Sequence, residues 1–246
     1  MPRIDWPNGY IRNDDAALYY EVHQSAQPNA PFLICLHGNN ETMQVFDEHT
    51  EHFLPHYNVI TVDTRGHGKS SRGERPLSYE LFAEDLFTLI NKLQIGSFLL
   101  LGFSDGGNTA LELALQHQER VAAMILVGAN LSPDGLTTPT RKALQLMAAG
   151  RGLKAALLRK EDAERELVRL MLEHPHIEAQ HLEKITVPTL VISGERDIIK
   201  DEHSELIATS LPNARRVVIP AVGHFVMKEA PEQFNRVVLD FLMEDD

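Results

Sequence analysis

The chain has 246 residues, 43% of them hydrophobic, and a formal net charge of −12 at pH 7. This length and hydrophobic content predict one sizeable core, in a single domain that carries an insertion. The acidic charge, with no basic cluster, disfavours nucleic acid and anionic membranes as partners. The single cysteine, Cys35, excludes a disulfide within the chain and a cysteine metal site.

Residues 1–7 lack the apolar core of a secretory signal, and no stretch approaches the length of a membrane span. We therefore expect a cytoplasmic protein with no membrane partner. No feature of the sequence indicates a particular oligomeric state.

Apolar runs with the character of strands alternate with amphipathic patterns typical of helices. The strands are expected at residues 18–23, 32–36, 57–63, 98–102, 122–127, 188–193 and 215–219. The helices outside the insertion are expected at residues 43–53, 78–93, 108–117 and 231–243. This alternation predicts an α/β fold, with a mostly parallel central sheet and helices on both faces.

The strand signal disappears from residue 132 to residue 184, and short helical patterns take its place at residues 141–149, 153–158, 163–172 and 178–184. Because strands precede and follow this interval, we interpret residues 132–184 as a helical cap inserted into a core of residues 1–131 and 185–246. The cap is expected over the carboxyl edge of the sheet, where ligands bind in such folds. It contains no aromatic residue, so we expect an aliphatic pocket lining from residues such as Leu146, Met147 and Leu157.

A strand turns into a helix within a few residues across Gly102-Phe-Ser-Asp-Gly106. Such a turn crowds the backbone, so the positions on either side of the serine must be nearly free of side chain. The following helix points its unpaired N–H groups at negative charge that forms nearby. The pattern predicts that Ser104 is a nucleophile with its hydroxyl presented at the end of the strand.

A serine hydroxyl needs a base to remove its proton, and the base needs an acid to orient it. Asp197 follows one later strand and His224 follows the next, so the chain order is Ser104, Asp197, His224. That is the order expected for a serine hydrolase on this sheet. We therefore predict His224 as the base and Asp197 as the acid, with Asp201 and Asp134 as alternatives for the acid.

Two backbone N–H groups are expected to bind the oxyanion of the reaction: that of Asp105, after the nucleophile, and that of Asn39, in the loop after residues 32–36. Gly38 permits close approach of the backbone, and His37 is expected to brace the loop. The segment 63–70 ends in Gly-Lys-Ser like a phosphate loop, but an aspartate stands where that motif requires glycine. We interpret it as a turn that packs under the oxyanion loop.

With these residues assembled, the chain resembles the α/β-hydrolase superfamily over nearly its whole length. The motifs that carry the resemblance are His37-Gly38, Asp63-x-Arg65-Gly66-His67-Gly68-x-Ser70, Gly102-x-Ser104-x-Gly106-Gly107, Gly194-x-x-Asp197 and Gly223-His224. The related dehalogenases and epoxide hydrolases have an aspartate at the nucleophile position, so Ser104 argues against both activities.

Within the superfamily, Gly102 to Gly107, Thr109-Ala-Leu111 and Leu126 to Asn130 look like the biphenyl-hydrolase-like branch, which includes valacyclovir hydrolase. The resemblance implies that Asp105, the acidic residue after the nucleophile, recognises the α-amino group of amino-acid esters. Physically, a carboxylate opposes oxyanion charge unless a cation compensates it. An ammonium about 5 Å away, at an effective dielectric near 20, would contribute roughly 3 kcal/mol. Alternatively, Asp105 complements the helix N-terminus or pairs with an arginine or lysine of the protein.

Our leading hypothesis is a cofactor-independent serine hydrolase that cleaves small carboxylic esters through an acyl-enzyme, with α-amino-acid esters as a special case. Asn40, Asn130 and Phe225 are further candidates for contact with the small-molecule substrate. A lactone, thioester or carbon–carbon bond hydrolase with the same triad stays open. So does a ligand-binding protein that turns over slowly.

Overall fold

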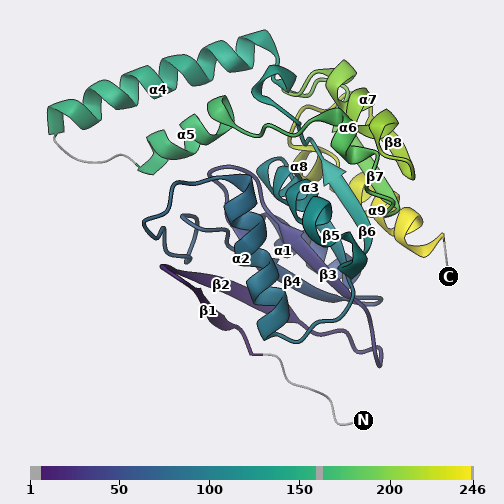
Figure 1. The fold of residues 1–246 in the computed structure, drawn as a ribbon. Helices are drawn as coiled ribbons and strands as arrows, with labels where there is room; N and C mark the ends of the chain where they lie inside the picture. Colours follow the sequence, from purple (N-terminus) through teal and green to yellow (C-terminus); the bar gives the residue numbers. More distant parts are fainter. Residues whose placement is uncertain (1–6, 159–162, 245–246) are drawn as a thin grey trace.

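The central element is an eight-stranded sheet in the order β1-β2-β4-β3-β5-β6-β7-β8 (Figure 1). The computed structural model describes residues 7–158 and 163–244, with side chains described outside 152–163. The pairs β1–β2 and β2–β4 are antiparallel, and the other neighbours are parallel. The strands are β1 Gly9–Asn13, β2 Ala16–His23, β3 Phe32–Leu36, β4 Asn58–Val62, β5 Phe98–Phe103, β6 Val121–Val127, β7 Thr189–Gly194 and β8 Ala214–Ile219. The predicted α/β fold with a mostly parallel sheet is confirmed.

Helices cover both faces of the sheet, and each face has its own apolar cluster. One cluster joins the sheet to α2, α3, α6 and α7, and the other joins it to α1, α8 and α9. The α-helices are α1 Asp47–Phe53, α2 Tyr79–Lys92, α3 Asp105–His117, α4 Thr138–Leu158, α5 Ala163–Glu173, α6 Ala179–Leu182, α7 Asp201–Ser210, α8 Val226–Glu229 and α9 Pro231–Met243. The 3₁₀ helices are η1 Met43–Phe46, η2 Gln118–Arg120 and η3 Pro133–Gly135.

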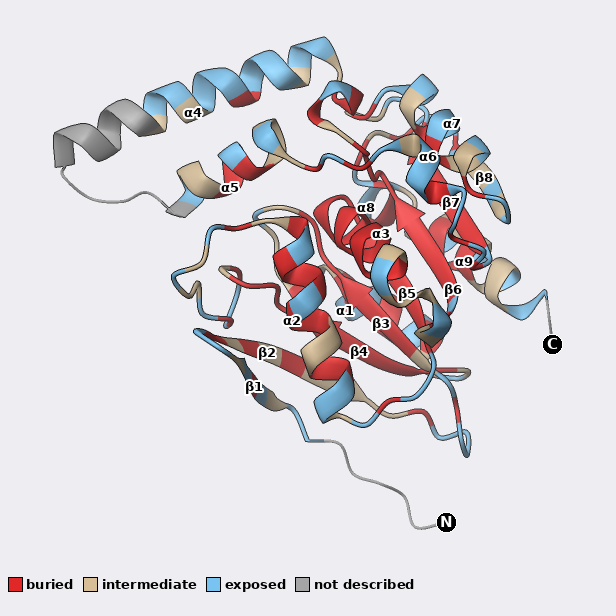
Figure 2. Ribbon diagram, viewed as in Figure 1, coloured by how far each residue is buried: buried red, intermediate tan, exposed pale blue. Residues whose placement is uncertain are grey.

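Central strands such as β4 and β5 are buried along their whole length because helices shield both of their faces (Figure 2). This double burial explains the continuous apolar runs in the sequence. One strand and two α-helices escaped the sequence analysis: β1, α7 and α8. β1 is an edge strand with one buried residue, Ile11, α7 buries only Ser204 and Ile207, and α8 is a single turn. Each carries too little periodicity to stand out.

Between β6 and β7 the chain forms η3, α4, α5 and α6, with α4 and α5 lying above the ends of the strands (Figure 1). The two helical patterns at residues 141–149 and 153–158 form one helix, α4. Leu182 of α6 joins the apolar cluster of the core. The boundaries of the cap, residues 132–184, stay a prediction.

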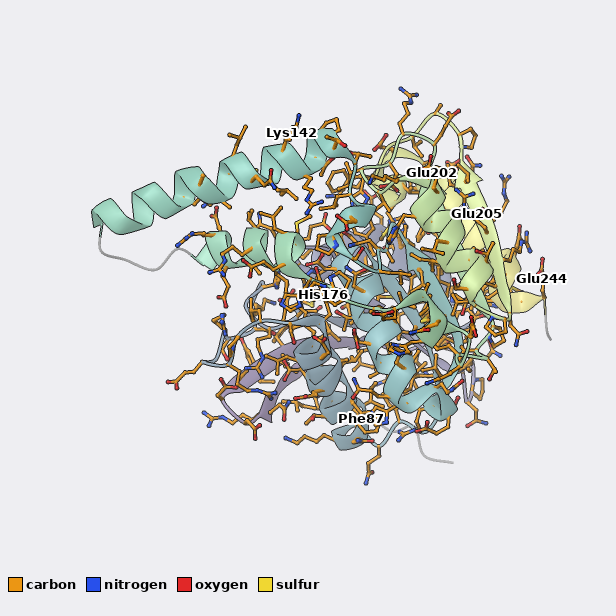
Figure 3. The ribbon with its side chains drawn as sticks, turned by 45° about the horizontal axis from the view of Figure 1, so that its top comes forward. Phe87, Lys142, His176, Glu202, Glu205 and Glu244 are labelled. Atoms are coloured by element: carbon orange, nitrogen blue, oxygen red, sulfur yellow. The ribbon has the colours of Figure 1, made fainter. Side chains whose placement is uncertain are left out.

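The expected cap lining is wrong for Leu146 and Met147, whose side chains are 75% and 48% exposed. Leu144 of α4 and Val168 of α5 belong to one apolar cluster, and the side chains of Leu146 and Met147 lie on the outward side of α4. Leu157 lies outside the residues whose side chains are described. Figure 3 likewise shows Lys142 at the outer surface of α4, with Glu202 and Glu205 at that of α7.

No helix in the described part of the chain combines the length and apolar character needed to cross a bilayer. Within those same residues, no group of three histidine, cysteine, aspartate or glutamate side chains is placed to hold a metal ion.

Glu112 is a buried carboxyl group of α3, two turns after Ser104. Burial, and secondarily the charge of Glu80, raises its pKa from 4.5 to about 7. The folded protein therefore holds more protons than the unfolded chain between pH 4.5 and 7, and its stability falls as the pH rises through that window. We expect Glu112→Gln to flatten this slope and to raise the free energy of unfolding at pH 8 by about 2 kcal/mol.

Denaturant unfolding of both proteins at pH 5 and pH 8 measures this effect. The exposed Glu51 of α1 offers the control Glu51→Gln, which should leave the slope unchanged. An unchanged slope in Glu112→Gln would contradict the assignment of this titration to Glu112.

Candidate active site

Ser104 stands between β5 and α3 in a strained backbone conformation, with φ 53° and ψ −115°. A non-glycine residue in this region costs on the order of 1–3 kcal/mol, which the surrounding structure must offset. The backbone N–H of Ser104 donates to the carbonyl of Val127, at 2.7 Å, and so anchors the turn to β6. The conformation turns the chain sharply from strand to helix, as the sequence predicts.

The glycines beside Ser104 are needed because the backbone packs against itself there. A Cβ atom at Gly102 would overlap the carbonyl oxygen of Gly106, and one at Gly106 would overlap the carbonyl oxygen of Leu36. The start of α3 therefore lies directly against the end of β3. This contact brings the loop after β3 close to Ser104.

The structure brings Ser104, His224 and Asp197 together in one chain of hydrogen bonds. His224 Nδ1 lies 2.6 Å from Asp197 Oδ1, and His224 Nε2 lies 3.0 Å from Ser104 Oγ. Because the carboxylate only accepts, Nδ1 carries the proton, and the lone pair of Nε2 accepts the hydroxyl proton of Ser104. This tautomer leaves the imidazole ready to take the proton of Ser104.

Asp197 is held by more than His224. Its Oδ1 accepts from the backbone N–H of Ile199 at 3.0 Å, and its Oδ2 accepts from that of Gly194 at 3.3 Å. Burial by itself would raise the pKa of Asp197, but the hydrogen bonds from His224 and the two N–H groups outweigh it and hold the pKa below its ordinary value. The side chain is therefore an anion at neutral pH.

The two alternative acids lie in other interactions. Asp134 pairs with Arg141 at 2.6 Å, and Asp201 pairs with Arg216. Of the three candidates, only Asp197 is hydrogen-bonded to His224.

The loop after β3 leaves one backbone N–H free beside the nucleophile. Gly38 N–H donates to Glu41 at 3.3 Å, and Asn40 N–H donates to His67 Nε2 at 3.1 Å. In the described residues, neither Asn39 N–H nor Asp105 N–H has a hydrogen-bond acceptor. These are the two groups predicted to bind the oxyanion, and that role stays a prediction.

The segment 63–70 packs under this loop, which confirms its interpretation as a supporting turn. Thr64 N–H donates to His37 Nε2 at 3.1 Å, and His37 Nδ1–H donates to the carbonyl of Gly38 at 2.7 Å. Burial, together with nearby His67, lowers the pKa of His37 to about 3. His37 is therefore neutral and braces the loop, as expected.

Asp105 lies in a buried polar cluster at the start of α3. Its Oδ2 accepts from Asn39 Nδ2 at 2.8 Å, and the hydroxyl of Tyr79 also donates to it. Burial raises the pKa of Asp105 to about 6, although both hydrogen bonds oppose the rise. No arginine or lysine pairs with this carboxyl group in the described residues. Of the two structural roles considered for Asp105, pairing with an arginine or lysine is therefore not observed, and interaction with the N-terminus of α3 is the one that applies.

The other predicted substrate contacts differ in their surroundings. Asn40 is exposed, with φ 55°. Asn130 is buried, and its Oδ1 accepts from Asn108 Nδ2 at 3.1 Å while its own Nδ2 donates to the carbonyl of Ser132. Phe225 is 46% exposed, and its ring lies 5.6 Å from the ring of His224. Asn130 thus has a structural role, and substrate contact by all three residues stays a prediction.

Sequence reasoning missed three residues at this site. Gly128, with φ 61°, leaves room for His224, because a Cβ atom there would lie 2.7 Å from His224 Cε1. Its place directly after a predicted strand is the signal that marks it. Tyr79 contacts Asp105 through its hydroxyl, and Leu167 contacts Asn39 through its backbone carbonyl. No feature in the sequence of their helices, α2 and α5, indicates these contacts.

A family model described as the alpha/beta hydrolase fold matches residues 31–153, half of the chain. Together with the sheet and the sharp strand-to-helix turn at Ser104, this match shows that the chain belongs to the α/β-hydrolase fold family.

Among its relatives, the chain is 28% identical to a Haemophilus influenzae protein named "Putative esterase/lipase", over 92% of this chain and 88% of that one. It is 27% identical to a hydrolase of solved structure from Pseudomonas aeruginosa, with a TM-score of 0.75 and coverage of 96% and 98%. It is 26% identical to a thermophilic esterase from Thermogutta terrifontis, with a TM-score of 0.74 and coverage of 92% and 93%. These relatives support the family and not the biphenyl-hydrolase-like branch in particular.

Proposed function

We propose that the protein is a serine hydrolase that cleaves small carboxylic esters through an acyl-enzyme. The observation that carries this proposal is the hydrogen-bonded chain from Asp197 through His224 to Ser104. Two unpaired backbone N–H groups beside the serine and the names of the esterase relatives support it.

In the proposed reaction, Ser104 Oγ attacks the ester carbonyl carbon while His224 Nε2 takes the hydroxyl proton. The N–H groups of Asn39 and Asp105 bind the oxyanion of the tetrahedral intermediate. His224 then gives its proton to the leaving alkoxide, which departs as the alcohol and leaves an acyl ester on Ser104. His224 next activates a water molecule, which releases the carboxylic acid and restores the serine. Asp197 stabilises the imidazolium in both steps.

Asp105 favours α-amino-acid esters as a substrate class. Its carboxyl group is buried beside the proposed oxyanion site, and its two identified side-chain donors, Asn39 and Tyr79, are neutral. A buried carboxylate without a cation is unfavourable, so a substrate ammonium group near it would be stabilised. The same cation would offset the repulsion between Asp105 and the developing oxyanion.

A matched pair of substrates tests this preference: an aminoacyl ester and its des-amino analogue with the same acyl chain and leaving group. We expect Asp105→Asn to lower kcat/KM for the aminoacyl ester at least about 10-fold more than for the analogue, the size of about 1.4 kcal/mol of lost pairing. Steady-state kinetics at pH 7.5, where Asp105 is charged, measures the ratio. Equal losses on both esters would remove the amine preference and leave the ester hydrolase proposal intact.

A further inference from the structure

The side chain of Asn39 connects three separate parts of the molecule. Its Nδ2 donates to Asp105 Oδ2 at 2.8 Å and to the backbone carbonyl of Leu167 at 3.0 Å. Asp105 opens α3 next to the nucleophile, and Leu167 lies in α5 of the predicted cap. One amide group therefore ties the loop after β3 to α3 and to α5.

The underside of α5 is seated on the start of α2. Leu167 and Leu170 pack with Leu77, Tyr79 and Phe82 in one apolar cluster. Tyr79 also donates its hydroxyl to Asp105. Thus α2 contacts the Asp105 carboxyl group through Tyr79, while α5 packs on Tyr79 and contacts Asn39 through the carbonyl of Leu167.

A second attachment of α5 lies away from this cluster. Glu166 of α5 forms a two-pronged ion pair with Arg72, with Arg72 Nε 2.6 Å from Glu166 Oε2. This pair is partly exposed and contacts neither the oxyanion loop nor the nucleophile. Its removal alters one attachment of α5 and leaves both hydrogen bonds of the Asn39 amide in place.

We propose that Asn39 is a positioning residue: its side-chain amide, tethered to Asp105 and to the carbonyl of Leu167, fixes the peptide that carries an oxyanion N–H. The inference rests on the proposed function, since it concerns the backbone N–H of Asn39, one of the two predicted oxyanion donors. Such a donor must stay about 2.7–3.1 Å from the oxyanion. Because both hydrogens of the Asn39 amide are held, one by α3 and one by α5, the peptide that carries this N–H is kept in place.

The residue type suits this task. Both acceptors, the Asp105 carboxyl group and the Leu167 carbonyl, are electron-rich, and an asparagine offers two N–H donors on one nitrogen. An aspartate at position 39 would place a second carboxylate against Asp105. The other titratable groups that face Asp105 are Tyr79, Glu41 and His224. None of them is a lysine or an arginine that would neutralise the two carboxylates.

Kinetics of Asn39→Ala on a simple ester provides the main test. The variant keeps the backbone N–H but loses both tethers, so we expect kcat to fall about 10- to 100-fold while KM changes less than about 3-fold. Such a loss is smaller than the 10²–10³-fold typical for complete removal of a donor. Glu166→Ala is the control, and its kcat should stay within about 2-fold of the wild-type value.

Asn39→Asp keeps the shape of the side chain and adds a pH signature. With two facing carboxylates, we expect a larger loss of kcat at pH 8 than in Asn39→Ala, and a smaller ratio of wild-type to variant kcat at pH 6, where the pair shares a proton. Circular dichroism establishes that each variant is folded.

Wild-type kcat in Asn39→Ala would overturn the inference, and so would an equal loss in Glu166→Ala, because seating of α5 alone would then explain the effect. A change confined to KM would also contradict it. If the wild-type protein neither hydrolyses an ester nor reacts with a fluorophosphonate, the proposed function fails, and this outcome is distinct from an unaffected Asn39 variant of an active enzyme.

Discussion

Ser104→Ala is expected to lower kcat for a carboxylic ester by about 10⁶-fold, because loss of the nucleophile removes the covalent route. The residual rate would come from substrate binding and from the N–H groups of Asn39 and Asp105. Reaction with a fluorophosphonate, which traps an activated serine, should be lost at the same time. Steady-state kinetics and mass spectrometry of the labelled protein measure the two effects.

Ser193 provides a matched control, since it is another buried serine at the end of a parallel strand, β7. Its hydroxyl has no hydrogen-bond partner in the described residues and is not bonded to His224. Ser193→Ala should retain wild-type kcat and labelling. Labelling that persists in Ser104→Ala would refute the assignment of the nucleophile.

Arg65→Met is expected to lower the free energy of unfolding by about 3–5 kcal/mol, the usual cost of leaving a buried charge without its partner. The Arg65 side chain is fully buried. Its guanidinium donates to both oxygens of Asp85, at 2.7 and 2.8 Å, and to Asp15 at 2.6 Å. Removal of the arginine leaves Asp85, whose side chain is 3% exposed, without a cation. Denaturant unfolding at pH 7 measures the loss.

Two further variants identify the cause. Arg75→Met removes an exposed pair with Glu84 and should cost less than about 1 kcal/mol. The double variant Arg65→Met/Asp85→Leu removes both buried charges and should recover a large part of the lost stability. A stability of Arg65→Met within 1 kcal/mol of wild type would show that the pair does not hold the turn at residues 63–70.

The segment that contains Arg65 is visible in the sequence, but the ion pairs that Arg65 forms are not. The aspartate that stands where a phosphate loop needs glycine argues against phosphate binding by the segment 63–70, and a supporting turn is the interpretation that the sequence leaves. The partners of Arg65, Asp15 and Asp85, are far from it in the chain. They lie in a turn and in a helix whose sequences have no distinguishing pattern. Only the fold brings three charges of this kind together.

In the cap, the sequence predicts the helices but not which of their faces turns inward. The helical character of the cap was visible because helical periodicity is local, but the face of α4 that turns inward depends on where α5 packs. Leu146 and Met147 were therefore predicted as lining and are exposed, whereas Leu167 of α5 is the residue that reaches the Asn39–Asp105 cluster.

The sequence by itself determined the α/β class, the strand-to-helix turn at Ser104 and the chain order of the proposed triad, because each follows from patterns within a few neighbouring residues. The tertiary structure alone decided which of three aspartates lies against His224, and it alone gave Asp105 its neutral partners. Side-chain pairing across 66 positions, as between Asn39 and Asp105, leaves no local trace. It depends on where the ends of β3 and β5 meet, and that is a property of the folded sheet.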